Sequence, residues 1–135
     1  SSYIKQIFPN TKVIGVEPEG AQGLSQSFKR NKPLQNLNVN SIADSLSAPL
    51  HMKYSFDIAK KVVDEIVTVT DDQMREFMIF AHKNFKLMLE PACVAGLAAL
   101  KYKLQNKLTN KNTLLILCGS NIDTKSWNSL INYNR

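Results

Sequence analysis

Residues 114–123 constrain the fold of this 135-residue chain more than any other segment. They read LLILCGSNID: an apolar run long enough for one buried strand ends at Cys118 and Gly119, and Asp123 then offers a helix N-cap. A strand that leads into a helix in this way is typical of a parallel sheet, and open α/β folds bind their ligands at its carboxyl edge. The sequence therefore predicts a thiol and a set of backbone amides at such an edge.

The rest of the chain alternates between strand-like and helix-like segments. Strand patterns fall at residues 12–16, 65–70 and 114–117, and helical patterns at 21–30, 54–63, 71–88, 92–105 and after Asp123, with loops at 32–40 and 106–112. Thr70 and Gln73 have the spacing of a capping box at the start of one helix. The alternation predicts an α/β fold, a partial parallel sheet with flanking helices, and the missing part of this thin sheet is expected upstream.

Charge and cysteine content narrow the classes of partner. The formal net charge is +6, but the lysines are spread along the chain and no nucleic-acid-binding signature accompanies them. The positive charge still allows a rival interpretation, a basic module that binds nucleic acid. Such a module would bind nucleic acid in a salt-sensitive way. No segment has the roughly 20 apolar residues of a membrane helix.

Cys93 and Cys118 do not form a CxxC pair and have apolar neighbours, so we expect two buried, reduced thiols in a cytoplasmic protein.

Five motifs, in this order, carry a resemblance to a known family. They are KVIGVEPEGA at residues 12–21, IADSL at 42–46, VDEIVTVTDD at 63–72, LMLEPA at 87–92 and LCGSNID at 117–123. Together they closely resemble the threonine dehydratase and serine racemase family of pyridoxal-phosphate enzymes, which have the tryptophan-synthase-β-like fold, fold type II. The likeness covers nearly all of this chain but only the C-terminal part of a typical member.

The resemblance implies that residues 1–135 are a single-domain fragment, the C-terminal part of the large cofactor-binding domain, without an ACT regulatory domain. In this family a lysine in a Ser-x-Lys-x-Arg-Gly motif holds the cofactor as a Schiff base, and a glycine-rich loop cradles its phosphate. Neither motif occurs in the 135 residues. Residues 27–30, SFKR, lack the Arg-Gly continuation, so we interpret Lys29 as a solvated lysine. We therefore expect no catalytic residue in this chain and no activity from the chain alone.

The resemblance places Cys118 beside the pyridine nitrogen of the cofactor. A carboxylate there would keep that nitrogen protonated, whereas a neutral thiol leaves it largely unprotonated. Gly119 would let the backbone pass close to the ring, and Glu90 and Asn121 would lie near the cofactor. Asn121 also matches a position that helps bind an activating nucleotide in serine racemase. The residues themselves allow simpler roles: a core thiol for Cys118, and for Glu90 a carboxylate favoured by a helix N-terminus.

A cation site is a further implication of the resemblance. In the family, Glu17 and the carbonyl of Ala21 correspond to oxygen ligands of a metal ion. Relatives that bind a divalent ion supply an aspartate where this chain has Gly23. A divalent cation, a monovalent cation and no cation are therefore all open.

The function that the resemblance implies is that of a threonine or serine dehydratase, an ammonia-lyase that converts a β-hydroxy amino acid to a 2-oxo acid and ammonia. One alternative is a serine racemase-like isomerase. Another is a non-catalytic half that binds a partner chain. The expected partners are a hydroxy amino-acid substrate and either the missing N-terminal half or further copies of the protein, with no nucleic acid and no membrane.

Overall fold

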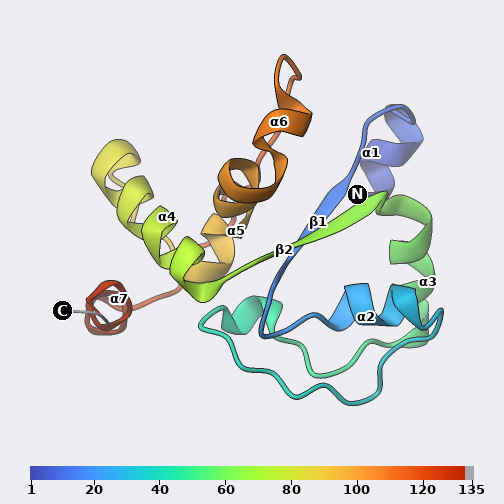
Figure 1. Ribbon diagram of the computed structural model, residues 1–135, viewed down its shortest axis with the longest axis horizontal. Coiled ribbons are helices and arrows are strands. Elements are labelled where there is room, and N and C mark those ends of the chain that lie inside the picture. The colour runs from blue at the N-terminus through green and yellow to red at the C-terminus, as the bar shows by residue number, and fades with distance from the viewer. Residues whose placement is uncertain (133–135) are drawn as a thin grey trace.

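The computed structural model describes residues 1–132, which form a small parallel sheet flanked by helices (Figure 1). This confirms the α/β fold class. The elements in chain order are α1 (Ser2–Ile7), β1 (Ile14–Pro18), α2 (Gly23–Lys29), the 3-10 turn η1 (Asp44–Leu46), α3 (Lys53–Val62), β2 (Glu65–Val69), α4 (Asp71–Phe85), α5 (Pro91–Ala99), the π-helical turn η2 (Leu100–Leu104), α6 (Gln105–Leu108) and α7 (Thr124–Ile131).

The two strands are parallel, as their place in the alternating order predicts. Gly15 pairs with Ile66 and Val16 with Val67, and the chain between them crosses over through α2, η1 and α3. Parallel neighbours need such a long connection because a tight turn cannot return the chain to the same end of the sheet. Helix α5 packs against both strands. In Figure 1, α2 and α3 lie on the other side of the strands from α4 and α5.

Local signals fix where the two central helices begin. At α4 the Thr70 hydroxyl accepts from the Gln73 amide at 3.1 Å, and the Gln73 side chain accepts from the Thr70 amide at 3.0 Å. This confirms the capping box. Helix α5 begins with Pro91 in its first turn, where the missing N–H costs nothing. Glu90 is the N-cap residue of α5, so its side chain lies at the start of that helix.

The main core lies between α4, α5 and α7. Met74, Met78 and Val94 are fully buried there, and the Trp127 ring of α7 closes one end. Helix α5 is built almost entirely of small apolar residues, which is why it can be buried against both the sheet and α4. The core therefore fixes the first turn of α5, and with it the position of Glu90.

The expected third strand does not form among residues 1–132. Residues 113–123 form neither a helix nor a strand, and the described sheet contains only β1 and β2. Leu114 is 82% exposed and Ile116 is 75% exposed, whereas Leu115 and Leu117 are half-buried. The alternation of exposed and half-buried residues is that of a strand, but a strand also needs a hydrogen-bonding neighbour, and no described segment supplies one. The prediction of a buried strand here was wrong for this part of the chain.

Other boundaries differ from the sequence-based expectation. The helix expected at residues 92–105 becomes α5 followed by η2, and α6 occupies part of the expected loop at 106–112. The short helix α1 was not predicted; its six residues make fewer than two turns, too short for a periodic pattern to show.

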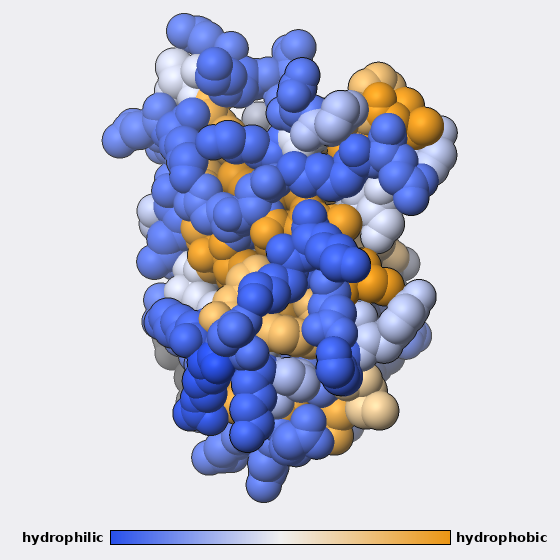
Figure 2. Space-filling model, turned by 90° about the vertical axis from the view of Figure 1, so that its right-hand side faces the viewer, coloured by the Kyte–Doolittle hydropathy of each residue, from blue (hydrophilic) through white to orange (hydrophobic). Residues whose placement is uncertain are grey.

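Figure 2 shows that hydrophilic residues cover much of one face of the molecule, with apolar residues visible between them. Within residues 1–132, no helix combines the length and the apolarity needed to cross a membrane.

Candidate functional site

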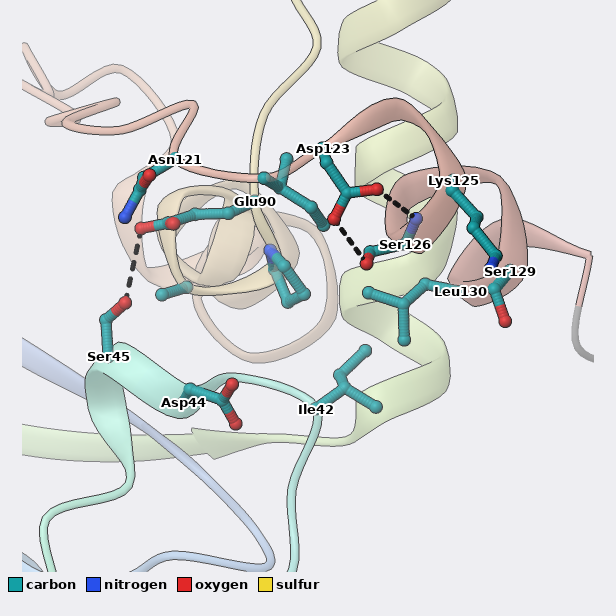
Figure 3. Close-up of a pocket in the computed structure, with 13 residues that line it drawn as sticks. Ile42, Asp44, Ser45, Glu90, Asn121, Asp123, Lys125, Ser126, Ser129 and Leu130 are labelled. Atoms are coloured by element: carbon teal, nitrogen blue, oxygen red, sulfur yellow. Dashed lines mark hydrogen bonds between the residues drawn. The ribbon is translucent and has the colours of Figure 1, made fainter.

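Glu90 joins three segments at the first turn of α5. Its Oε1 atom accepts a hydrogen bond from the Ser45 hydroxyl of η1 at 3.3 Å. The same oxygen accepts from the Cys93 thiol, one turn along α5, at 3.6 Å. Figure 3 shows the Ser45 and Glu90 side chains pointing toward one another, with Asn121 beside Glu90. The carboxylate is therefore held by neighbours rather than pointing freely into solvent.

Gly119 lies against the same carboxylate. A Cβ atom at this position would lie 2.9 Å from Glu90 Oε1 and 3.0 Å from Cys93 Sγ. Real Cβ contacts of that length are essentially never seen, so a side chain at residue 119 would force Glu90 or Cys93 to move. Glycine at this position therefore lets the Glu90 carboxylate lie against the backbone of residue 119.

The two thiols have different environments. Cys93 is buried, at 2% exposure, as expected, but Cys118 is exposed. The expectation of a buried Cys118 was wrong, because the segment at 113–123 has no neighbouring strand among the described residues to cover it. Burial, then the adjacent Cys118 thiol and the Glu90 carboxylate, raise the pKa of the Cys93 thiol to about 12. Cys93 is therefore a neutral hydrogen-bond donor at neutral pH.

A cavity of about 930 Å³ opens beside Glu90. Its wall is mostly polar and includes the apolar side chains of Ile42 and Leu130 between polar residues (Figure 3). The polar part includes Asp44, Ser45, Glu90 and Asn121. A hollow lined by several hydrogen-bonding side chains could bind a polar small molecule.

Comparison with known proteins decides the family. The family model for pyridoxal-phosphate dependent enzymes matches residues 1–119, most of the chain. The chain belongs to this family. It is 39% identical over 127 residues to phenylserine dehydratase of Ralstonia pickettii, covering 94% of this chain and 39% of that protein. It is 32% identical over 121 residues to the catabolic L-threonine dehydratase TdcB of Escherichia coli, covering 89% of this chain and 37% of that protein.

Solved structures of pyridoxal-phosphate dependent enzymes share the fold. Threonine deaminase isoform 2 of Solanum lycopersicum, in its processed form, matches with a TM-score of 0.88 and 28% identity, over 98% of this chain and 39% of that one. Serine racemase of Dictyostelium discoideum matches with a TM-score of 0.77 and 31% identity, over 88% of this chain and 38% of that one. The chain thus spans about two fifths of the length of the relatives named here. The resemblance to the dehydratase and racemase family is confirmed.

The structure brings together the four residues that the resemblance places near pyridoxal phosphate. Glu90 and Asn121 line the cavity, Gly119 lies against Glu90, and Cys118 adjoins Gly119 with an exposed side chain. The donor set fits the polar edge of such a cofactor: Glu90 and Asn121 face the cavity, and Cys118 offers a thiol close to Asn121 in the chain. Their roles toward the cofactor stay predictions.

Two members of this cluster were missed by sequence reasoning. The sequence predicts only a buried thiol at Cys93, and it places Ser45 only within the motif at 42–46. The spacing of Glu90 and Cys93, three residues apart at a helix start, was the available signal, because such residues share one helix face. Nothing in the sequence indicates that Ser45, 45 residues from Glu90, would donate to it.

Glu17 performs a structural task in the predicted cation site. Its two carboxylate oxygens accept hydrogen bonds from the amides of Leu24 at 2.6 Å and Ser25 at 3.0 Å. These two bonds satisfy N–H groups in the first turn of α2 that have no partner within the helix. The Ala21 carbonyl accepts from the Gly23 amide at 3.0 Å. Within residues 1–132, no group of three or more His, Cys, Asp or Glu side chains is arranged to hold a metal ion. A site built from Glu17 and backbone carbonyls stays a prediction.

Proposed function

We propose that the complete protein carrying this chain is a pyridoxal-phosphate-dependent ammonia-lyase that converts a β-hydroxy amino acid to a 2-oxo acid and ammonia. The observation that carries the proposal is the pair Glu90 and Asn121 on the cavity wall, with Gly119 against Glu90 and Cys118 next to Gly119. It lies in a chain similar to a phenylserine dehydratase and a threonine dehydratase. The proposed substrate class is that of amino acids with a hydroxyl on Cβ.

Cys118 would set the protonation state at the cofactor's ring nitrogen. When bound, pyridoxal phosphate supplies the electron sink that makes removal of the Cα proton feasible. A thiol is only a weak hydrogen-bond donor, so Cys118, unlike a carboxylate, would not keep a proton on that nitrogen. A weakened electron sink limits the lifetime of negative charge at Cα and favours prompt loss of the β-hydroxyl.

Glu90 would act as a positioning residue at the same edge. The Ser45 hydroxyl and the Cys93 thiol both donate to it, which fixes the carboxylate against Gly119. A carboxylate held by these two donors would lie beside Asn121 at the cavity wall. Asn121, on the cavity wall, would supply an amide for hydrogen bonding to a bound molecule.

A serine racemase-like isomerase is the second candidate, favoured by the similarity to serine racemases of Dictyostelium discoideum and Schizosaccharomyces pombe. Racemisation needs a second acid or base on the opposite face of the substrate, which this chain's cluster does not identify. The product distinguishes the two activities: a 2-oxo acid from the lyase, and the D-amino acid from the isomerase.

The test is a product assay on the complete protein reconstituted with pyridoxal phosphate. L-threonine, L-serine and L-threo-phenylserine are supplied separately, and 2-oxo acid, ammonia and D-serine are measured. We expect 2-oxo acid and ammonia in equal amounts from at least one substrate. The isolated 135-residue chain, which contains no Ser-x-Lys-x-Arg-Gly motif, is expected to give none. D-serine as the sole product would overturn the lyase assignment in favour of the isomerase, and loaded protein without any product would favour a non-catalytic role.

Two substitutions at one position test the role of Cys118. Cys118→Ser keeps a neutral donor and should retain most of the activity. Cys118→Asp places a carboxylate at the ring nitrogen and should lower kcat by roughly tenfold or more, the effect of ~1.4 kcal/mol on the barrier. Asn110→Asp adds the same charge in an exposed turn and is the matched control. Equal kcat values for Cys118→Asp and Asn110→Asp would contradict the assignment.

A further inference from the structure

Residues 40–46 pass the carboxyl ends of β1 and β2 before they reach the cavity. Just beyond β1, the Asn40 amide donates a hydrogen bond to the Gly20 carbonyl at 2.9 Å. Just beyond β2, the same segment meets Asp71, the first residue of α4. Open α/β sheets bind their ligands at these strand ends, so the contacts that fix this segment also shape the ligand site.

Asp71 holds this segment with both oxygens of its side chain. Oδ1 accepts a hydrogen bond from the Ser41 hydroxyl at 2.7 Å, and Oδ2 accepts one from the Ile42 amide at 3.2 Å. The Ser41 hydroxyl oxygen in turn accepts from the Ala43 amide at 3.2 Å. Ser41, Ile42 and Asp71 are half-buried and Ala43 is fully buried. Because every partner belongs to this chain, the contact does not depend on an exposed surface.

The residues held in this way continue into one wall of the cavity. Ile42, Asp44 and Ser45 line the cavity, and the last two begin η1. Figure 3 shows these three side chains along one side, with Glu90 across from Ser45. The Ser45 hydroxyl donates to Glu90 Oε1 at 3.3 Å. The wall is therefore tied to α5 at one end and, through Asp71, to α4 at the other.

We propose that Asp71 is a positioning residue for the ligand site. Its carboxylate sets the place of the wall formed by Ile42, Asp44 and Ser45, and through this wall it sets the affinity for pyridoxal phosphate and for the amino-acid substrate. The inference rests on the proposed function, which puts both molecules at this cavity. Asp71 acts through the wall and the Ser45–Glu90 bond, so loss of its carboxylate should weaken binding and leave the chemical step nearly unchanged.

The neighbouring Asp72 separates the effect of the contact from the effect of the charge. Both carboxylates lie in the first turn of α4, where an acidic side chain stabilises the helix N-terminus. Asp72 is exposed and pairs with Arg75 of its own helix at 2.6 Å. Asp72→Ala therefore removes a similar charge from the same helix turn and leaves the bonds from Ser41 and Ile42 to Asp71 in place.

Hydrogen exchange of the complete protein without ligand tests the contact itself. Mass spectrometry follows exchange in peptides from residues 41–47 and, as a reference, from residues 91–99 of α5. We expect faster exchange at 41–47 in Asp71→Ala, because the Ile42 amide loses its acceptor and the Ser41 hydroxyl is released. Asp72→Ala should leave this segment unchanged, and residues 91–99 should be unchanged in both variants. Equal exchange at 41–47 in the two variants would overturn the proposal.

Cofactor titration and steady-state kinetics of the complete protein test the consequence for binding. In Asp71→Ala we expect the dissociation constant of pyridoxal phosphate and the KM of the substrate to rise by about two- to tenfold, the range of one net hydrogen bond. The kcat at saturating cofactor should change by less than about twofold. Asp72→Ala should match the unaltered protein in all three quantities.

Two outcomes separate this inference from the proposed function. Faster exchange at residues 41–47 with unchanged affinity for cofactor and substrate would overturn the positioning role of Asp71 and leave the lyase assignment standing. A complete protein that forms no 2-oxo acid would overturn the lyase assignment, and the exchange rates and the cofactor titration would still decide the role of Asp71.

Substitutions at Ser41 provide a milder form of the same test. Ser41→Ala removes the hydroxyl that donates to Asp71 and should reproduce part of the rise in KM and in exchange. Ser41→Thr keeps a hydroxyl and should behave like the unaltered protein. In the double variant of Asp71→Ala and Ser41→Ala, the rise in KM should be smaller than the product of the two single rises, because both remove the same bond. Fully multiplicative effects would contradict the role of this bond.

Discussion

The indole N–H of Trp127 donates to the backbone carbonyl of Leu89 at 3.1 Å, and both residues are buried. This bond ties α7 to the segment that leads into α5, one residue before Glu90. The position of α7 and the start of α5 are thus linked by a single side chain, whose ring also lies 4.9 Å from that of His82 on α4.

Trp127→Phe should destabilise the protein. Phenylalanine keeps much of the apolar ring but leaves the buried Leu89 carbonyl without its donor, at a cost of about 1–3 kcal/mol. Denaturant unfolding followed by far-UV circular dichroism measures the loss. Tyr54→Phe, which removes a hydroxyl from a side chain exposed on α3, is the control and should change the free energy of unfolding by less than about 0.5 kcal/mol. Equal effects of the two substitutions would contradict the role of the Trp127 bond.

Thr70→Ala should weaken the start of α4. The substitution removes the acceptor for the Gln73 amide and half of the capping box, which typically costs about 1 kcal/mol. Thr11→Ala, in an exposed loop, makes the same chemical change away from a helix end and should be close to neutral. The midpoint of urea unfolding should fall for Thr70→Ala alone, with an unchanged slope.

Stability should also depend on pH through Asp64. The hydrogen bond from Lys5, then that from the Val13 amide, lower the pKa of the Asp64 carboxyl in the folded protein. A lowered folded-state pKa gives stability that is fully present above the unfolded-state pKa of ~3.9 and is lost as the pH falls through the lower, folded value. Asp64→Asn should therefore reduce stability at neutral pH and make the unfolding midpoint fall less steeply below pH ~4. Parallel pH profiles for the two proteins would show that Asp64 has no linkage to folding.

Gly119→Ala should perturb the site while leaving the fold intact. The new methyl group would lie 2.9 Å from Glu90 Oε1, so the flexible carboxylate must move and its bond from Ser45 should break. We expect roughly tenfold weaker binding of pyridoxal phosphate to the complete protein, equivalent to ~1.4 kcal/mol. In Gly15→Ala the nearest atoms lie 3.5 Å from the new Cβ, an ordinary contact, so that variant should bind the cofactor normally. Unchanged cofactor affinity in Gly119→Ala would place the binding site elsewhere.

Much of the fold could be predicted because its signals are local. Thr70 and Gln73 define a helix start on their own, and the strand pattern at Glu65–Val69 is complete within five residues. The pairing at Leu114–Leu117 could not be predicted in the same way, because pairing depends on a neighbour elsewhere in the chain. An apolar run shows that a segment can form a strand. Whether that segment is buried depends on which other segments pack against it.

In the candidate site, too, the features that depend on local sequence could be predicted, and those that depend on tertiary packing could not. Glu90, Gly119 and Asn121 could be selected from motifs, and their proximity follows from the order of elements in the family. The Ser45–Glu90 and Cys93–Glu90 hydrogen bonds depend on the tertiary packing of η1 and α5, so no pattern in the sequence indicates them. The exposure of Cys118 was missed because apolar neighbours in the sequence do not guarantee burial.

Within residues 1–132, Leu114–Leu117 pairs with no other strand, so this segment should promote self-association at high concentration. This segment has the features of an exposed strand edge. No described strand pairs with its backbone N–H and C=O groups, and its Leu114 and Ile116 side chains are exposed. Such an edge favours self-association. Expressed alone, the 135 residues should collect in inclusion bodies. Co-expression with a second polypeptide that supplies a neighbouring strand should cover this edge and keep the 135-residue chain in the clarified lysate.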